Sequence, residues 1–450
     1  MAGLCRALGA HVTGCDARES DYLNILRAQD FLCWAGHSPM HLASVNAVVY
    51  SSAIRADNPE MCAARALGLP CYSRAQMLAA LQTGSCTIAI AGTHGKTTTT
   101  WLAAHVLMAA GLDPSVMVGG HVAALGGNWR LGRGPHFVIE VDESDRSLLE
   151  FRPTISIITN VDREHLDHYR DMDDIRETFA KYIQQTHSDG CLIVCCDDAE
   201  ADALSACWPG RTIRYGLDRR RRPDFTVQAL ELEPRASTFE VCTGARSIGR
   251  ATLSLPGEHN VQNALSTFAL AHVLEIPFES VAAALARVDG VGRRLQHVGE
   301  CAGVTVWDDY AHHPREVKAT VKAARRIASG RLIGVFQPHR YSRTQHLAEE
   351  FGDAFDGLDL IVLAPIYAAS EEPIAGVSSQ LIADAVGRHG SVACSMAPSV
   401  ADIAPDLAEI VTPGDTVITL GAGDVHRVGR DLLRLLEPKS TPNLAGVHNT

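Results

Sequence analysis

Short apolar runs alternate along the chain with longer segments rich in alanine and leucine. Runs such as CTIAIA at 86–91, HFVIEV at 136–141, TISIITNV at 154–161 and DTVITL at 415–420 are typical of buried strands. Segments such as WLAAHVLMAAG at 101–111 are typical of helices. This alternation predicts an α/β fold, in which helices cover largely parallel sheets.

Two interruptions divide the pattern. Polar residues at 81–85 precede the strand CTIAIA, and GVGRR at 290–294 precedes a fresh series of strands and helices. At roughly 150 residues per domain, a chain of 450 residues accommodates three domains. We expect domains over residues 1–83, 84–292 and 293–437 and a disordered tail over 438–450, which is polar and contains proline.

The first segment predicts half of a Rossmann-like unit. We expect a helix over 3–8, a strand ending at Asp16, a strand over 46–54 and a helix over 59–68. An open α/β unit normally starts with a strand and a glycine-rich turn, whereas here the first residues already belong to a helix. The sequence therefore predicts an incomplete nucleotide-binding unit.

Charge and hydropathy exclude several classes of protein. Lysine and arginine number 40 against 52 aspartates and glutamates, a net charge of −12, so the whole chain has no pull toward nucleic acid or anionic membrane. No apolar run approaches the roughly 20 residues of a membrane-spanning helix, and the N-terminus lacks the pattern of a secretory signal. We expect a cytoplasmic protein without nucleic-acid or membrane partners.

The 13 cysteines are scattered and form no Cys-x-x-Cys pair. In so long a chain this usage indicates reduced thiols that act as small apolar side chains. No cysteine and histidine recur at zinc-ligand spacing, although 20 histidines leave such a site possible.

Gly92-Thr93-His94-Gly95-Lys96-Thr97 is the sharpest motif in the chain. It lies between an apolar strand and a helix that begins with a run of threonines. Glycines let the backbone wrap an anion, a helix start presents free N–H groups, the lysine adds charge and a threonine hydroxyl can bind Mg²⁺. Ile90 stands where the common eight-residue phosphate loop has its first glycine, so this is a shorter form. The motif predicts nucleotide binding.

Acidic residues at the ends of neighbouring strands could hold the magnesium ion. Asp142, Glu143 and Asp145 follow the strand HFVIEV, and periodicity does not decide which of them binds metal. The next strand leads to His165, flanked by several carboxylates. A metal-ligand role and a structural role for His165 are about equally supported by spacing.

Three further segments carry polar side chains suited to binding. Asn260 and Asn263 open a helix, where they could cap it or recognise a base edge, and Arg293-Arg294 lies at the expected boundary of the third domain. Two strand-end loops of that domain, DDYAHHP at 308–314 and QPHRYSRT at 337–344, suit an anionic substrate. The arginine run DRRRRPD at 218–224 is short and flanked by acids, which favours a solvated turn over a phosphate site.

From these residues alone we expect an ATP- and Mg²⁺-dependent phosphoryl-transfer enzyme, either a kinase or a ligase. Taken in order, the motifs resemble the Mur ligase family. The resemblance extends from near residue 1 to about residue 435 and rests on AGTHGKTTTT, VDESDRSLL, NVDREHLDHY, GEHNVQNAL, GVGRR, DDYAHHPREV, FQPHRYSRT and LGAGD.

The resemblance implies three domains: an incomplete Rossmann-like domain for a uridine nucleotide, a central ATPase domain and a C-terminal Rossmann-like domain. It implies that ATP phosphorylates the lactyl carboxylate of UDP-N-acetylmuramate and that the amine of L-alanine attacks the acyl phosphate. This chemistry belongs to peptidoglycan precursor synthesis and hence to cell shape and division. ATP and Mg²⁺ are the implied cofactors, and a monomer or weak homodimer is expected.

The resemblance also implies roles for individual residues. Lys96, His165 and Arg294 would be catalytic, and Thr97, Glu143 and His165 would bind metal. Tyr310, His312, His339 and Arg343 would face the substrates. The implied ATP contacts are Gly92, Thr93, His94, Gly95, Lys96, Thr97, Thr98, Asn260, Asn263, Arg294 and Asp308.

Several alternatives stay open. A ligase that attaches a recycled murein peptide to the same nucleotide sugar shares the core motifs, and a catalytically silent homologue is a different class. The family's first strand and glycine turn would precede Met1, so we expect either coding sequence upstream of Met1 or weak binding of UDP-N-acetylmuramate. Lys181 lies near the position of a carbamylated lysine in some members, but its polar surroundings favour an exposed helix lysine.

Overall fold

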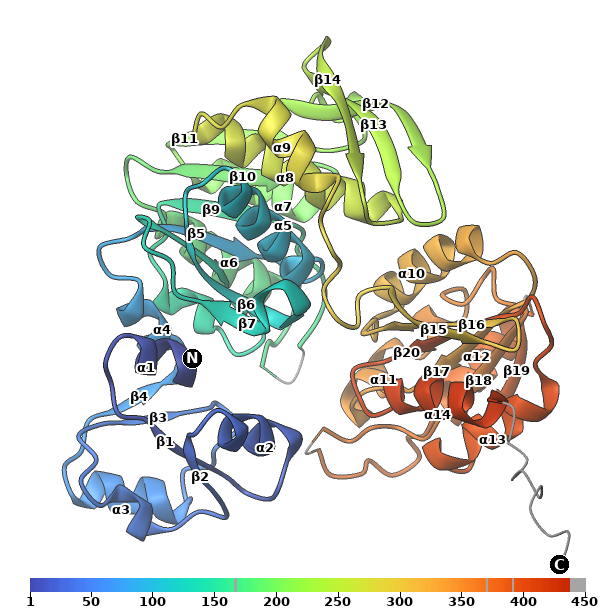
Figure 1. Ribbon diagram of the computed structural model, residues 1–450, viewed down its shortest axis with the longest axis horizontal. Helices are drawn as coiled ribbons and strands as arrows, with labels where there is room; N and C mark the ends of the chain where they lie inside the picture. The colour runs from blue at the N-terminus through green and yellow to red at the C-terminus, as the bar shows by residue number, and fades with distance from the viewer. Residues whose placement is uncertain (166–167, 370, 391, 438–450) are drawn as a thin grey trace, which may run out of the picture. The chain divides into compact units, whose positions relative to one another are not determined.

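A computed structural model describes residues 1–165, 168–369, 371–390 and 392–437 (Figure 1). The expected tail over 438–450 lies outside these residues. Contacts group the chain into two compact units. Unit 1 comprises Met1–Glu231, Thr238–Ser254 and Asn260–Asp289, and unit 2 comprises Leu232–Ser237, Leu255–His259 and the chain from Gly290 onward. None of the helices in the described ranges combines the length and apolar composition that a membrane span requires.

The N-terminal part of unit 1 contains two small parallel sheets, β1 with β2 and β3 with β4. Ser73 and Gln76 form a capping box at the start of the helix that follows β4. The elements are α1 (Ala2–Ala7), β1 (Thr13–Asp16), α2 (Asp21–Ala28), β2 (Leu32–Ala35), η1 (Pro39–Leu42), β3 (Val48–Tyr50), α3 (Pro59–Ala66), β4 (Cys71–Ser73) and α4 (Arg74–Leu81).

The expected strand over 46–54 is wrong beyond Tyr50. β3 pairs only with the three residues of β4, and the chain then turns, with the Ile54 N–H donating to the Ser51 carbonyl at 3.0 Å. Without a longer partner strand, the apolar residues after Tyr50 have no ladder to join. The helices expected over 3–8 and 59–68 are confirmed within two residues at each end.

A ten-stranded sheet fills the rest of unit 1, in the order β14-β13-β12-β11-β10-β9-β5-β8-β6-β7. The pairs from β11 through β9, β5 and β8 to β6 are parallel, whereas β7 is antiparallel to β6. The strands are β5 (Cys86–Ala91), β6 (Ser115–Val122), β7 (Gly127–Arg130), β8 (His136–Glu140), β9 (Ile155–Ile158), β10 (Cys191–Cys195), β11 (Arg211–Tyr215), β12 (Phe225–Leu232), β13 (Ser237–Thr243) and β14 (Arg246–Leu253).

Buried apolar strands and helices form the core of this sheet. Strands β5 and β9 are apolar on both faces, which is typical of a parallel sheet covered on both sides. Phe179, Tyr182 and Ile183 of α6 pack into a buried cluster with residues of β5, β8 and β10. The helices of this part are α5 (Lys96–Ala109), α6 (Met172–Gln184), α7 (Ala199–Leu204), α8 (Glu258–Val273) and α9 (Phe278–Leu285).

The register of three central strands positions the candidate site. Ile90 of β5 pairs with Glu140 of β8, and Ala91 pairs with Ile158 of β9. The three strands are parallel, so the loops that follow them begin at one edge of the sheet. Three segments are therefore neighbours, as the sequence predicts: the motif at Gly92–Thr97, the loop with Asp142, Glu143 and Asp145, and the segment leading to His165.

Unit 2 holds a six-stranded sheet in the order β15-β16-β20-β17-β18-β19, with β15 antiparallel and the other pairs parallel. Two separate apolar clusters, one on each face, sandwich it. Its elements are β15 (Gln296–Cys301), β16 (Val304–Asp309), α10 (Pro314–Ile327), β17 (Leu332–Phe336), α11 (Tyr341–Leu347), β18 (Leu360–Leu363), α12 (Gln380–His389), β19 (Ala393–Met396), α13 (Val400–Ile410), β20 (Thr416–Leu420) and α14 (His426–Leu436).

Candidate active site

The loop between β5 and α5 is held in a left-handed backbone by two glycines. Gly92 has φ 137° and Gly95 has φ 78°. A Cβ on Gly92 would lie 2.0 Å from Thr159 Oγ1, and a Cβ on Gly95 would lie 2.8 Å from Asn263 Oδ1. Neither position has room for a larger residue, so the close approach of the neighbouring segments requires glycine.

Side chains that follow β9 brace this loop. Asn160 accepts the His94 N–H at 2.8 Å and donates to the His94 carbonyl at 3.0 Å, and Thr159 Oγ1 donates to the same carbonyl at 2.7 Å. The Asp162 N–H donates to Thr93 Oγ1 at 2.9 Å. These bonds fix the loop before any ligand binds, which lowers the entropic cost of binding an anion.

Lys96 is the first residue of α5 and is largely buried. Its ammonium donates to Glu143 Oε2 at 2.6 Å and to the carbonyls of Gly92 and Thr93 at 2.6 and 3.1 Å. Thr98 is buried in the first turn of the same helix. The lysine therefore lies across the phosphate loop, as the motif predicts.

Carboxylates set the charge of this lysine. Burial alone lowers the pKa of the Lys96 ammonium, but Glu143, Asp142 and Glu140 outweigh it and the net pKa lies above its ordinary value. Burial raises the pKa of the Asp142 carboxyl, yet Lys96 and the Ser144 N–H together hold that pKa below its ordinary value. Both groups therefore stay charged at neutral pH.

The sequence did not decide which of three acidic residues binds metal, and of these three Glu143 is the one that accepts a hydrogen bond from Lys96. Asp142 accepts the Ser144 N–H and Asp145 accepts the Ser147 N–H, each at 3.0 Å, so both shape their own loop. The Tyr169 hydroxyl donates to the Glu143 carbonyl at 2.5 Å and fixes the backbone at that residue. The structure therefore separates one candidate ligand from two loop-forming acids.

Glu140 is a site residue that the sequence analysis missed. Its Oε1 accepts the Thr97 hydroxyl at 3.1 Å and its Oε2 accepts the Gly119 N–H at 2.8 Å. Glu140 is the last residue of β8, directly after the buried Phe137, Val138 and Ile139, and this carboxylate at a strand end was the available signal. It adds a second carboxylate to the Thr97 end of the site.

The residues present fit a magnesium ion. Among the described residues the buried Glu143 Oε1 has no hydrogen-bond partner, and the ring Nε2 of His165 lies 3.5 Å from it. His165 itself has a left-handed backbone, φ 55°. A buried carboxylate oxygen next to an imidazole nitrogen is an O/N donor set that suits a divalent cation.

Asn260 and Asn263 lie in the first two turns of α8 and are buried. The contact of Asn263 with Gly95 brings α8 to the phosphate loop. The sequence left helix capping and ligand recognition open, and this contact associates Asn263 with the loop.

In unit 2, Asp308 pairs with Arg293, the neighbour of the arginine singled out from the sequence. Arg293 Nε lies 3.1 Å from Asp308 Oδ2, and Thr419 Oγ1 donates to Asp308 Oδ1 at 2.6 Å. The Arg294 guanidinium lies 5.2 Å from the ring centroid of Tyr310. Both guanidinium groups therefore lie near the Tyr310 ring, at 5.0 Å for Arg293 and 5.2 Å for Arg294, and Arg293 also pairs with Asp308.

The four expected substrate-facing residues form one cluster. His312 lies edge-on to Tyr310 and to His339, with ring centroids 5.4 and 5.5 Å apart. Arg343 Nη1 lies 2.9 Å from His339 Nδ1. Tyr367 stacks on His339, with ring centroids 5.7 Å apart. The sequence analysis missed this residue, although it lies in the loop after the strand DLIVL, just as the other residues of the cluster lie after strands.

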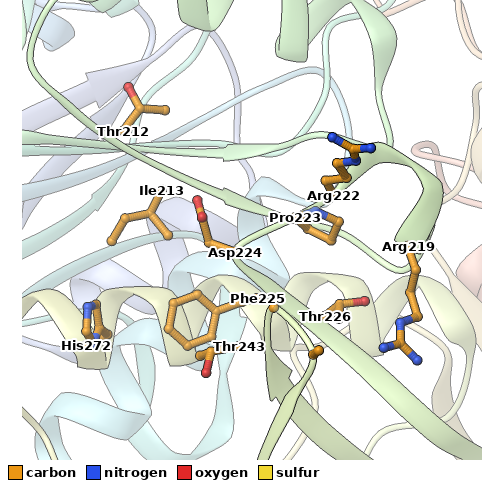
Figure 2. A pocket seen from close by; sticks show the side chains of 12 residues that line it. Thr212, Ile213, Arg219, Arg222, Pro223, Asp224, Phe225, Thr226, Thr243 and His272 are labelled. Atoms are coloured by element: carbon orange, nitrogen blue, oxygen red, sulfur yellow. The ribbon is translucent and has the colours of Figure 1, made fainter.

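The arginine run lies between β11 and β12. It forms a single turn, η5 (Arg219–Arg221), in which Arg220 is exposed and pairs with Asp218, so the expected turn is confirmed. Arg219 and Arg222 line a pocket of about 700 Å³ with an apolar wall that includes Phe225 (Figure 2).

Lys181 is an exposed helix lysine, as expected. It pairs with Glu177 one turn away, with an N–O distance of 2.7 Å, and more than half of both side chains is exposed.

Known sequences and structures resemble the chain over its whole length. The profile described as Mur ligase family, catalytic domain, matches residues 1–84, Mur ligase middle domain matches 90–271, and Mur ligase, glutamate ligase domain, matches 293–423. The UDP-N-acetylmuramate--L-alanine ligase of Desulfatibacillum aliphaticivorans is 43% identical over 96% of this chain and 95% of its own. That of Sorangium cellulosum is 42% identical over 98% and 94%.

Two solved structures share the fold. A UDP-N-acetylmuramate-alanine ligase from Thermotoga maritima aligns with a TM-score of 0.80 and 26% identity over 96% of this chain and 95% of that one. A murein peptide ligase from Psychrobacter arcticus aligns with a TM-score of 0.71 and 24% identity over 97% and 95%. With matches over all three parts and more than 40% identity to full-length relatives, this chain belongs to the Mur ligase family.

Proposed function

We propose that this protein is an ATP-dependent ligase that joins L-alanine to the lactyl carboxylate of UDP-N-acetylmuramate in the cytoplasm. The names of relatives at 40–43% identity over nearly the whole chain support this assignment. The observation that carries the chemistry is Lys96, held across the phosphate loop by Glu143. The proposed domains are 1–83 for the nucleotide sugar, 84–292 for ATP and 293–437 for the amino acid.

The central residues prepare the phosphoryl transfer. The N–H groups at Gly92–Thr98 and the ammonium of Lys96 bind the ATP phosphates. When ATP binds, phosphate oxygens replace Glu143 as the partner of this ammonium. Asn260 and Asn263 contribute to the adenine side. Thr97, Glu143 and His165 would hold Mg²⁺, which when bound neutralises charge on the transferring phosphoryl group.

The proposed reaction has two steps. A lactyl carboxylate oxygen attacks the terminal phosphorus of ATP, forming an O–P bond as ADP leaves. The amine of L-alanine then attacks the carbonyl carbon of the acyl phosphate, the C–N bond forms, the C–O bond to phosphate breaks and the amine loses a proton. The products are the amide, ADP and inorganic phosphate.

Residues of unit 2 serve the substrates in this scheme. Arg294 stabilises charge on the phosphoryl group, and Asp308 contributes on the nucleotide side. Tyr310, His312, His339 and Arg343 bind the muramoyl and amino-acid groups. Tyr310 and Arg343 each contact one of the two histidine rings, and the two rings contact each other. These contacts support the assignment of the four residues to one binding surface.

Substrate-dependent release of ADP tests the proposal. Release that requires both UDP-N-acetylmuramate and L-alanine is expected. Release with a murein tripeptide in place of L-alanine would instead identify the recycling ligase, and no release with either would identify a silent homologue. The Lys96→Ala variant provides the blank, since both active alternatives need this lysine.

A further inference from the structure

The N-terminal part of unit 1 contains a cluster of metal-binding side chains far along the chain from the phosphate loop. The Sγ of Cys15, the Nδ1 of His41 and a carboxylate oxygen of Glu60 all lie within 4.8 Å of one another. Glu60 Oε2 lies 2.9 Å from the sulfur and 3.5 Å from His41 Nδ1. His37 adds another nitrogen, 3.2 Å from the sulfur and 3.5 Å from Glu60 Oε2.

The fold assembles this cluster from four separate segments. Cys15 is near the end of β1, and His37 follows β2, which runs parallel to β1. His41 lies in η1, and Glu60 lies in the first turn of α3. Parallel strand ends meet at one edge, so side chains without any regular spacing in the sequence converge there.

The cluster is largely shielded from solvent. The side chains of His37, His41 and Glu60 are 17%, 14% and 14% exposed. The His41 ring stacks on Trp34 with centroids 4.3 Å apart and planes 6° from parallel. Side chains that are already positioned and shielded from water favour metal binding, because they lose little conformational freedom when the ion binds.

Two polar groups here are poorly satisfied by the protein alone. His41 Nδ1 is buried and, in the described ranges, makes no hydrogen bond, although Glu60 Oε2 lies 3.5 Å from it. Within the described residues, Glu60 has no ion pair with a lysine or arginine, and the Cys15 thiol and two imidazoles are its polar neighbours. A buried carboxylate beside an orphaned imidazole nitrogen carries a desolvation cost that a cation would remove.

The distances are close to those around a tetrahedral ion. With ligand bonds of about 2.0–2.3 Å, neighbouring donors around tetrahedral zinc are roughly 3.3–3.5 Å apart. His41 Nδ1 lies 3.5 Å from Glu60 Oε2. The thiol–carboxylate hydrogen bond, at 2.9 Å, has to lengthen when the ion binds.

We propose that Cys15, His41 and Glu60 bind a zinc ion. The combination of a thiolate, an imidazole and a carboxylate favours Zn²⁺ over the hard ions Mg²⁺ and Ca²⁺. The ion would tie β1, η1 and α3 together. This site is separate from the magnesium ligands proposed for ATP.

A zinc titration of the full chain tests the proposal. The protein is stripped with a chelator and titrated with Zn²⁺ against a chromophoric chelator, with excess Mg²⁺ present to occupy the Thr97 end of the phosphate site. One equivalent of tight binding is expected. Cys15→Ser and His41→Asn should each weaken that equivalent by more than about tenfold, at least the loss that follows from disturbing the partners of metal ligands.

The matched control is Cys62→Ser, which removes an exposed cysteine two residues after Glu60. It should bind zinc as the unaltered protein does. Substitution with Co²⁺ gives a second readout, since a sulfur-to-cobalt charge-transfer band must be present in Cys62→Ser and absent in Cys15→Ser. Circular dichroism verifies that each variant is folded. If Cys15→Ser does not fold, His41→Asn still tests the proposal.

Two results would overturn the proposal. One is the absence of a tight equivalent of Zn²⁺ in the unaltered chain. The other is an equivalent that persists unchanged in both Cys15→Ser and His41→Asn, which would assign the zinc to other cysteines or histidines. Either result leaves the ATP-dependent reaction untouched, so the two proposals fail separately.

Discussion

The ammonium of Lys96 lies 2.6 Å from Glu143 Oε2, with 12% of the lysine side chain and 3% of the glutamate side chain exposed. Lys96 is therefore already paired with a carboxylate before nucleotide binds, and the second oxygen of the same glutamate has no hydrogen-bond partner within the described part of the chain. Because the two charges are buried together, the stability of this site depends on both of them, and a cation or a phosphate that binds here has to compete with the pair.

Lys96→Ala is expected to abolish turnover and to destabilise the fold. Removing one partner of a buried pair typically costs about 3–5 kcal/mol, because the other charge is left uncompensated. ADP release and the free energy of unfolding in denaturant measure the two effects. Lys181→Ala, which breaks an exposed pair with Glu177, is the control and should cost less than about 0.5 kcal/mol.

A double variant separates the two roles of this lysine. Lys96→Met combined with Glu143→Gln removes both charges and should recover most of the stability lost in Lys96→Ala. It should stay inactive, because the phosphate ligand is gone. Equal instability of the single and double variants would contradict the assignment of the cost to an unpaired glutamate.

Gly92→Ala should disable the phosphate loop. The added Cβ would meet Thr159 Oγ1 and the Asn160 carbonyl, at 2.0 and 2.9 Å, in a backbone conformation that disfavours alanine. A displaced loop is expected to reduce kcat/KM for ATP by about 100-fold or more. Gly127→Ala is the control, since Gly127 has no neighbour within 4 Å of its Cβ position and should leave kcat/KM unchanged.

Asp309 should give the protein a measurable pH dependence. Burial raises the pKa of its carboxyl to about 6, despite Arg294 and the N–H groups of Ala311 and Leu295, which lower it. The folded protein therefore binds this proton more tightly than the unfolded chain. Its contribution to stability is complete below about pH 4 and is lost as the pH rises through 6, by up to about 3 kcal/mol.

Chemical denaturation of the unaltered chain and of Asp309→Asn between pH 4 and 7 isolates this contribution. Other titrating groups are common to both proteins and cancel in the difference. The stability of the unaltered chain should fall relative to Asp309→Asn over this interval. Parallel curves would show that the carboxyl does not take up a proton on folding.

Arg343→Lys should impair the cluster around His339 without changing its charge. The arginine donates from one nitrogen to both the Nδ1 and the carbonyl of His339, at 2.9 and 3.1 Å. Lysine has a single point donor and no planar guanidinium, so kcat/KM for the proposed substrates should fall by about tenfold. Arg326→Lys, at an exposed position on α10, is the control, and an equal loss there would indicate a general effect of the substitution.

The sequence predicted which loops meet, because parallel strands bring their ends to one edge. The motif at Gly92–Thr97, the acids after β8 and the segment leading to His165 are neighbours for that reason. The choice among Asp142, Glu143 and Asp145 could not be read from periodicity. It depends on local turns, in which two of the acids accept hydrogen bonds from their own loop.

Other details depend on backbone geometry that no residue pattern reveals. Arg293 adopts a left-handed conformation, φ 60°, and it rather than Arg294 pairs with Asp308. Glu140 ends β8, and its side chain reaches Thr97 of α5 only because β8 is next to β5. Cys15, His37, His41 and Glu60 show no ligand spacing at all, and only the fold brings them together.

The hydrogen bonds of the two central histidines of unit 2 fix where each carries its hydrogen. Arg343 can only donate, so His339 Nδ1 accepts and neutral His339 bears its hydrogen on Nε2. The Tyr310 carbonyl can only accept, so His312 Nδ1, at 2.9 Å, bears the hydrogen. The two imidazoles, whose ring centroids are 5.5 Å apart, are thus opposite tautomers when both are neutral, with the hydrogen on Nε2 of one ring and on Nδ1 of the other.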